Sequence, residues 1–160
     1  MSFPLKRCDI VCFLWFYGLC LGIQLLGGYF TAQGVVDWYP TLVKSPLTPP
    51  GAAFGIVWSI LYALMAWAAC RIYSGVGRAN IRPLRWWFIQ LLLGFIWCVV
   101  FFGRHDPVAG FIVLCGTTFA AIVATVLFWR LDEKAGLLMA PLVLWLTLAT
   151  HLNLYILLNN

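Results

Sequence analysis

The run VAGFIVLCGTTFAAIVATVLFW, residues 108–129, decides the fold class of this protein. Its 22 residues include no Asp, Glu, Lys or Arg. At 1.5 Å of rise per residue, an α-helix of this length is sufficient to span the ~30 Å hydrocarbon core of a bilayer. The run therefore predicts a transmembrane helix.

Four more apolar runs of similar length flank it, separated by connections that contain Gly, Pro or charged residues. None alternates every second residue, as the strands of a membrane β-barrel do, and a helix satisfies its own backbone hydrogen bonds in lipid. We therefore expect an all-α membrane protein, a single domain over residues 1–160, built as a bundle of five transmembrane helices. The predicted helices cover about residues 10–30, 52–70, 86–102, 108–129 and 135–158, with a polar, proline-rich connection over residues 32–50.

The composition excludes a soluble domain. Hydrophobic residues make up 64% of the chain and charged residues 9%, whereas about a quarter of the residues of a soluble protein are charged. The net charge of +5 does not indicate nucleic-acid binding, because the basic residues fall in loops between apolar runs. The six cysteines form no Cys-x-x-Cys pair and mostly lie within apolar runs, so we expect neither a disulfide framework nor a metal site.

The basic residues predict an orientation in the membrane. Five spans place the N-terminus and the second and fourth connections on one side, and eight of the ten Lys and Arg residues lie there. Because basic residues are retained in the cytoplasm, we expect a cytoplasmic N-terminus and an external C-terminus, in a bacterial cell membrane or an organelle membrane. The eight are Lys6, Arg7, Arg71, Arg78, Arg82, Arg85, Arg130 and Lys134; Lys44 and Arg104 lie on the other side.

No spanning run has a charged residue near its centre, as proton relays, voltage sensors and ion transporters usually require. The chain also lacks the His-Glu-x-x-His, Gly-x-Ser-x-Gly and P-loop patterns of zinc proteases, serine hydrolases and nucleotide-binding proteins. We therefore assign no catalytic residue and expect no obligatory cofactor.

Aromatic and small polar residues recur at helical spacing on three of the runs. Residues three or four apart share one face of a helix. Trp58, Trp97 and Trp145 lie too deep within their runs for the aromatic belt of a membrane surface. The stripes are Phe54, Trp58, Tyr62 and Met65 on the second run; Gln90, Gly94, Trp97 and Phe101 on the third; and Pro141, Trp145, Ala149 and Leu152, with Asn153 beside them, on the fifth.

Two interpretations of these stripes stay open. The aromatic side chains could pack one helix against another, which is the commoner role for any one of them in a bundle. Three stripes that each carry a deep Trp also fit an aromatic-walled pocket, in which Gly28 and Ala149 would leave room for a flat ligand. His151 could ligate haem, but it lies roughly 200° around its helix from Ala149, so we do not expect it to face such a pocket.

Four segments of the chain form an ordered pattern that covers nearly its whole length. They are Trp38-Tyr39 with Lys44 and Pro49-Pro50; Phe54-Gly55-x-Val57-Trp58-x-x-Leu61-Tyr62-x-x-Met65; Gln90-Leu91 with Trp97 and Phe101-Phe102-Gly103; and Pro141-x-x-x-Trp145 with Leu152-Asn153. This pattern resembles the TspO/MBR family, the tryptophan-rich sensory proteins and mitochondrial translocator proteins, the latter also known as peripheral-type benzodiazepine receptors.

The resemblance implies a five-helix bundle, often a homodimer, with a pocket closed by the first loop. It implies a membrane receptor or sensor that binds porphyrins such as protoporphyrin IX, and in many members cholesterol or benzodiazepine-like drugs. By position, the implied pocket includes Gly28, Thr31, Trp58, Trp97, Trp145, Ala149 and Leu152. With the stripes and the first-loop prolines added, the candidate ligand-binding residues are Gly28, Thr31, Pro49, Pro50, Phe54, Trp58, Tyr62, Gln90, Trp97, Phe101, Trp145, Ala149, Leu152 and Asn153.

The chain departs from the family pattern at positions that bear on the pocket. Gly94 stands where Asn is usual and Val99 where Pro is usual, and Leu47 and Ala52 replace common aromatic residues. Leu154 and Leu158 replace the Tyr and the basic residue of the family's sterol-recognition pattern. Sterol binding through that element is therefore not expected.

Two further functions stay open. The same pocket would serve a transporter of porphyrins or sterol-like molecules. The resemblance also implies a light-driven, Trp-dependent porphyrin degradation, in which Trp58 and Trp145 would take part. We rank this enzyme last, because no acid–base or metal constellation supports turnover.

Overall fold

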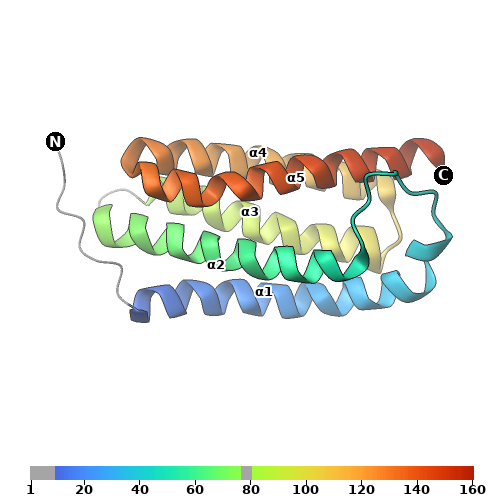
Figure 1. Ribbon diagram of the computed structural model, residues 1–160, viewed down its shortest axis with the longest axis horizontal. Coiled ribbons are helices and arrows are strands. Elements are labelled where there is room, and N and C mark those ends of the chain that lie inside the picture. The colour runs from blue at the N-terminus through green and yellow to red at the C-terminus, as the bar shows by residue number, and fades with distance from the viewer. Residues whose placement is uncertain (1–9, 77–80) are drawn as a thin grey trace.

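The computed structural model describes residues 10–76 and 81–160, and it consists of five long helices that run side by side (Figure 1). Each helix is long and apolar enough to cross a bilayer, and the described residues contain no strand. The predicted all-α five-helix bundle is therefore confirmed. The helices are α1 (Ile10–Asp37), α2 (Gly51–Val76), α3 (Arg82–Cys98), α4 (Pro107–Leu131) and α5 (Glu133–Asn159).

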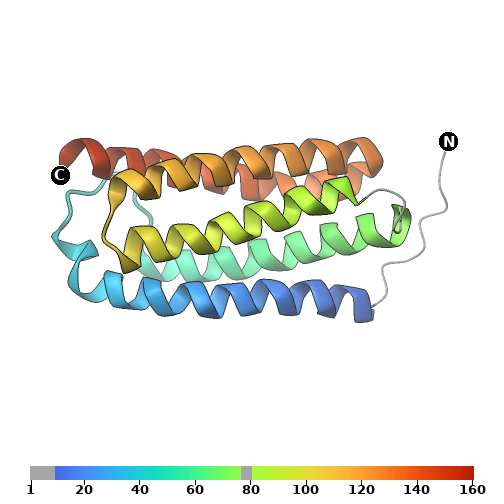
Figure 2. The ribbon, with the colours of Figure 1, turned by 180° about the vertical axis from the view of Figure 1, so that it is seen from behind.

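The helices form a closed ring. Helix α1 packs against α2 and α3, α2 packs against α5, and α4 packs against both α3 and α5. The order around the ring is therefore α1, α2, α5, α4 and α3, and Figure 2 shows α1, α3 and α4 from behind. Helices α2 and α5, which carry two of the three aromatic stripes, are neighbours in this ring.

Helix α1 continues to Asp37, seven residues beyond its predicted end near residue 30. The pair Gly27-Gly28 does not end it, because Gly27 provides close contact between helices instead. A Cβ on Gly27 would lie 3.1 Å from Cys98 Sγ of α3. The connection that was predicted over residues 32–50 therefore begins only after Asp37 and is shorter than expected. It contains one 3₁₀ turn, η1 (Tyr39–Thr41).

The short connections on either side of α4 end in helix caps. Asp106 Oδ1 accepts a hydrogen bond from Ala109 N (3.0 Å), and Pro107 occupies the first helical position, where its missing N–H costs nothing. Asp132 caps α5 in the same way by accepting from Lys134 N (3.1 Å). Before Asp106, α3 widens into a π-helical turn, η3 (Val99–Gly103).

Small side chains allow the helices to approach closely at the centre of the ring. Ala66, Ala69, Ala121 and Ala124 are completely buried. Large apolar side chains point outward on every helix, with Leu25 of α1 76% exposed and Leu144 of α5 73% exposed. This arrangement fits a bundle surrounded by hydrocarbon, which needs no polar surface along its length.

Candidate ligand site

An aromatic cluster joins α2 to α5. The ring of Trp145 makes edge contacts with Phe54, at a centroid distance of 5.5 Å, and with Trp58, at 6.4 Å. Trp58 in turn stacks on Tyr62 one turn further along α2, at 5.4 Å. The structure thus brings together four of the predicted ligand-binding residues, and all but Phe54 also pack against the same buried core.

A groove with a volume of about 440 Å³ lies beside this cluster on the outer side of α2 and α5. Its walls are almost wholly apolar. Ile60 and Leu144 on its rim are 54% and 73% exposed, so the groove opens toward the surrounding lipid. Trp145 belongs to the groove and to the cluster. The lining residues are Val57, Ile60, Leu61, Leu64, Pro141, Leu144, Trp145 and Leu148.

The residues of this groove other than Pro141 and Trp145 were missed in the sequence. Val57, Ile60 and Leu64 recur three and four residues apart, as do Pro141, Leu144 and Leu148. That spacing is the available signal, but every lipid-facing stripe of a membrane helix shows it as well. Only the neighbouring positions of α2 and α5 in the ring turn the two stripes into a groove.

The third stripe joins α3 to α5 closer to the end of the bundle. Trp97 Nε1 donates to Asn153 Oδ1 (3.2 Å), and Asn153 Nδ2 donates to Pro107 O at the start of α4 (3.0 Å). Trp97 also stacks on Phe101 at 5.2 Å. Because both ends of the Asn153 amide are bonded to protein, this residue holds three helices together.

The first loop covers this end of the bundle (Figure 1). Trp38 packs on Phe101 at a centroid distance of 5.2 Å, and Tyr39 packs on Phe102 at 5.7 Å. Burial raises the pKa of the Tyr39 hydroxyl above its usual value. Trp38 is also stacked on His105 (4.7 Å), which holds a positive φ of 55° in the connection before α4. The aromatic residues of the loop thus close over those of η3.

Two polar anchors fix the first loop. Val43 N donates to Asn160 Oδ1 (2.9 Å), and Asn160 Nδ2 donates to Val43 O (3.2 Å), which ties the loop to the end of α5. Lys44 Nζ donates to the carbonyl oxygens of Tyr39 (3.0 Å), Pro40 (3.3 Å) and Leu42 (3.1 Å). The Lys44 ammonium group therefore stabilises the conformation of the loop.

The remaining candidate residues are spread over the bundle. Gln90 and Leu152 are buried, and Ala149 is partly buried against the core. Thr31 donates to Gly27 O (3.0 Å) within its own helix. Gly28 and Pro50 are exposed and Pro49 is partly buried, and a Cβ on Gly28 would meet no atom within 4 Å.

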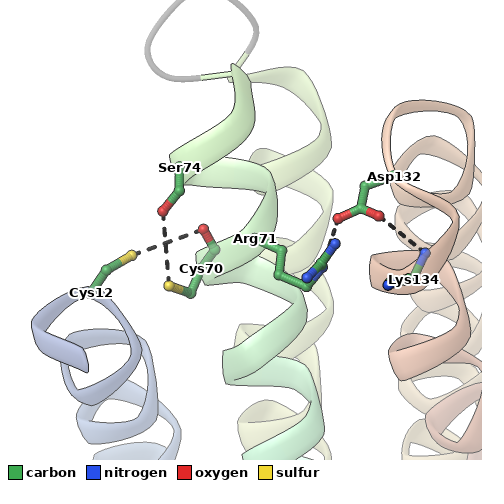
Figure 3. A network of polar contacts seen from close by, with 6 residues as sticks. All are labelled: Cys12, Cys70, Arg71, Ser74, Asp132 and Lys134. Carbon is green, nitrogen blue, oxygen red and sulfur yellow. Dashed lines mark hydrogen bonds and ion pairs between the residues drawn. The ribbon is translucent and has the colours of Figure 1, made fainter. Parts of the chain in front are cut away.

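A polar network closes the opposite end of the bundle (Figure 3). Arg71 Nε of α2 pairs with Asp132 Oδ2 of the α4–α5 connection (2.7 Å). Helix α2 ends at Val76, beyond its predicted end near residue 70, so Arg71 lies within it. Cys12 Sγ of α1 lies 4.0 Å from Cys70 O, and Cys70 Sγ lies 4.0 Å from Ser74 Oγ. Cys70 is disulfide-bonded.

Five membrane-length helices with an aromatic cluster between two of them define an integral, multi-pass membrane protein. A model of the TspO/MBR family matches residues 16–158. The chain therefore belongs to the TspO/MBR family, and the resemblance drawn from the sequence is confirmed.

Relatives from bacteria, archaea and animals are similar over most of their length. The chain is 36% identical to protein CrtK of Rhodobacter capsulatus over 72% of this chain and 74% of that protein. It is 34% identical to the tryptophan-rich protein TspO of Archaeoglobus fulgidus, over 88% of this chain and 91% of the relative. The human translocator protein is 28% identical over 80% of this chain and 78% of its own length.

Proposed function

We propose that this protein is a membrane receptor that binds porphyrins and related flat apolar molecules between α2, α3 and α5, beneath the first loop. The observation that carries the proposal is the cluster of Phe54, Trp58, Tyr62 and Trp145, which presents several ring faces and edges between two neighbouring helices. Relatives named tryptophan-rich sensory protein and translocator protein support it.

The chemistry of the cluster suits such a ligand. Aromatic pairs gain about 0.5–1.5 kcal/mol beyond the burial of their area when they stack with an offset or meet edge to face. A porphyrin offers a wide ring to several of these side chains at once. Since the cluster borders a groove of about 440 Å³, a planar molecule of several hundred Å³ could enter with limited movement of α2 and α5.

Binding is tested by titrating protoporphyrin IX into the purified protein and measuring the quenching of Trp fluorescence. The Trp58→Ala, Trp145→Ala double variant is expected to lose most of the saturable quenching. Trp15→Ala is the matched control, because Trp15 is 60% exposed on the outer face of α1. The proposed site is rejected if the double variant binds protoporphyrin IX as tightly as the wild type.

A transporter of the same ligands is the second candidate, and the open side of the groove favours it. A molecule dissolved in the bilayer could pass Ile60 and Leu144 to reach Trp145. Porphyrin flux into liposomes above a protein-free control would support transport. Binding without flux would support the receptor function instead. The homodimer implied by the resemblance is likewise a proposal, and chemical cross-linking in native membranes tests it.

A further inference from the structure

One histidine in the connection between η3 and α4 is stacked against the first loop. The ring centroids of His105 and Trp38 lie 4.7 Å apart, and the ring planes are only 13° from parallel. Trp38 begins the first loop, since α1 ends at Asp37 and the turn η1 starts at Tyr39. The contact therefore joins the loop to a segment far from it in the sequence, at one end of the bundle (Figure 2).

The backbone at His105 has an unusual conformation. Among the described residues, His105 is the one residue other than glycine with a positive φ, at 55°. Such a conformation is costly for an L-residue and persists where surrounding contacts fix it. Asp106 N donates to Val100 O (3.3 Å), and Asp106 Oδ1 accepts from Ala109 N (3.0 Å). These two bonds fix the residue after His105, so the stack on Trp38 belongs to a well-defined connection.

Trp38 passes this contact on to the rings beneath the loop. Its ring meets Phe101 edge to face at 5.2 Å, and Phe101 stacks on Trp97 at 5.2 Å. The carbonyl oxygen of Trp38 also accepts hydrogen bonds from Thr41 N (3.0 Å) and Thr41 Oγ1 (2.7 Å), which form the turn η1. How firmly Trp38 is held therefore affects both the turn of the loop and its packing on the bundle.

The strength of the stack depends on the charge of the imidazole ring. His105 is exposed, so its ring exchanges protons with the surrounding water. Histidine is the side chain that ordinarily changes its charge between pH 5 and pH 8. A cation within about 6 Å of an aromatic centroid is attracted to the ring face, and indole attracts it best. Protonation of His105 thus adds a cation–π attraction to the stack.

The other ionisable groups on the elements around His105 do not share this pH range. Asp, Lys and Arg side chains ordinarily keep their charge between pH 5 and pH 8. Burial raises the pKa of the Tyr39 hydroxyl further above the range of histidine. The Lys44 ammonium group is bonded to three carbonyl oxygens of the loop. These groups are Asp37 of α1, Tyr39 and Lys44 of the first loop, and Arg104 and Asp106 beside His105.

We propose that His105 and Trp38 form a pH-sensitive closing contact for the first loop. Protonated His105 holds Trp38 more firmly, so the loop opens less often at low pH. As the pH rises and the ring becomes neutral, the cation–π attraction is lost and the loop opens more often. The inference goes beyond the proposed function, because it concerns the motion of the loop and holds with or without a bound porphyrin.

Hydrogen–deuterium exchange of the loop amides measures this contact. His105→Asn removes the imidazole ring and keeps a residue type that tolerates a positive φ. Dividing the exchange rate of this variant by the rate of the wild type at the same pH cancels the intrinsic pH dependence of exchange. For the amides of residues 38–42, this ratio is expected to be about two- to fivefold larger at pH 5 than at pH 8. An equal ratio at the two pH values would overturn the inference.

Two Trp38 variants separate a cation–π contact from ordinary packing. In a Trp38→Leu background, which lacks the aromatic face, His105→Asn is expected to give the same ratio at both pH values. Trp38→Phe keeps a ring that attracts a cation less strongly than indole does, so it is expected to reduce the difference between pH 5 and pH 8. A full pH dependence in Trp38→Leu would overturn the proposed contact.

His151→Asn is the matched control, because it removes the second histidine from an exposed position on α5. This variant is expected to keep the pH dependence of the wild type, and its loss would assign the effect to His151. Asp37→Asn tests an ion pair, since Asp37 directly precedes Trp38. It is expected to keep the pH dependence as well. If Asp37→Asn abolishes it, an ion pair with His105 replaces the stack as the cause, and the inference is wrong.

Discussion

At the scale of single residues, glycines of α1 determine how closely this helix approaches α3 and η3. Gly34 is buried, and a Cβ at this position would lie 2.6 Å from the carbonyl oxygen of Phe102 and 3.0 Å from its Cα. The obstructing atoms belong to the backbone, so they cannot move aside as a flexible side chain could. Gly22, on the same helix, has no atom within 4 Å of a Cβ.

We expect Gly34→Ala to destabilise the protein by about 1–3 kcal/mol, because the added methyl group forces α1 away from η3. Gly22→Ala is the matched control, and it should be neutral or raise stability by up to ~1 kcal/mol through its better helix propensity. Thermal unfolding in one detergent measures both variants. Equal unfolding temperatures for the two variants would contradict this close contact.

At the scale of elements, the first loop is hydrogen-bonded to the end of α5 through the side chain of Asn160. Asn160 makes both hydrogen bonds to Val43 and a third from Nδ2 to Ile156 O (2.8 Å). The aromatic contacts of Trp38 and Tyr39 hold the beginning of the loop, whereas Val43 is exposed and depends on Asn160. A substitution of Asn160 should therefore release the middle of the loop, around Val43, while the beginning of the loop stays packed.

We expect Asn160→Ala to release the middle of the loop without unfolding α5. Hydrogen–deuterium exchange should become faster over residues 42–48, because the Val43 N–H loses its acceptor. Porphyrin association and dissociation should both become faster if the loop covers the site. Asn159→Ala is the control, because Asn159 Nδ2 bonds only to Tyr155 O of its own helix (2.8 Å); exchange as fast in this control as in Asn160→Ala would show that Asn160 is not the anchor.

At the scale of the whole molecule, the two ends of the helix bundle are closed by different contacts. Aromatic side chains and the first loop close the end where α5 finishes, and the Arg71–Asp132 ion pair joins α2 to the α4–α5 connection at the other end (Figure 3). Arg82, Arg85, Arg130 and Lys134 lie near the helix ends or connection on that same side. The basic side of the bundle therefore faces away from the first loop.

We expect this basic side to face the cytoplasm and the first loop to face outward. A C-terminal alkaline phosphatase fusion expressed in bacteria should then be active, and a C-terminal green fluorescent protein should be dark. The reverse pattern would overturn the orientation and place the first loop on the cytoplasmic side.

The sequence was sufficient for the fold class, because apolar runs such as residues 108–129 have one stable form in lipid. It failed at the end of α1, which continues from the predicted end near residue 30 to Asp37. Helical spacing placed Trp58 and Tyr62 on one face correctly, and they do stack. It could not give the Asn153–Pro107 bond, because that contact depends on the tertiary arrangement of α4 and α5.

The opening of the groove toward the surface of α2 and α5 has a consequence for how affinity should be measured. A hydrophobic ligand that approaches from the hydrocarbon phase is diluted by lipid or detergent, and its volume concentration in the buffer is the wrong scale. Doubling the detergent at fixed protein and ligand would then roughly halve the apparent affinity, although no contact with Trp145 has changed. Dissociation constants for this protein therefore belong in mole fractions of the apolar phase.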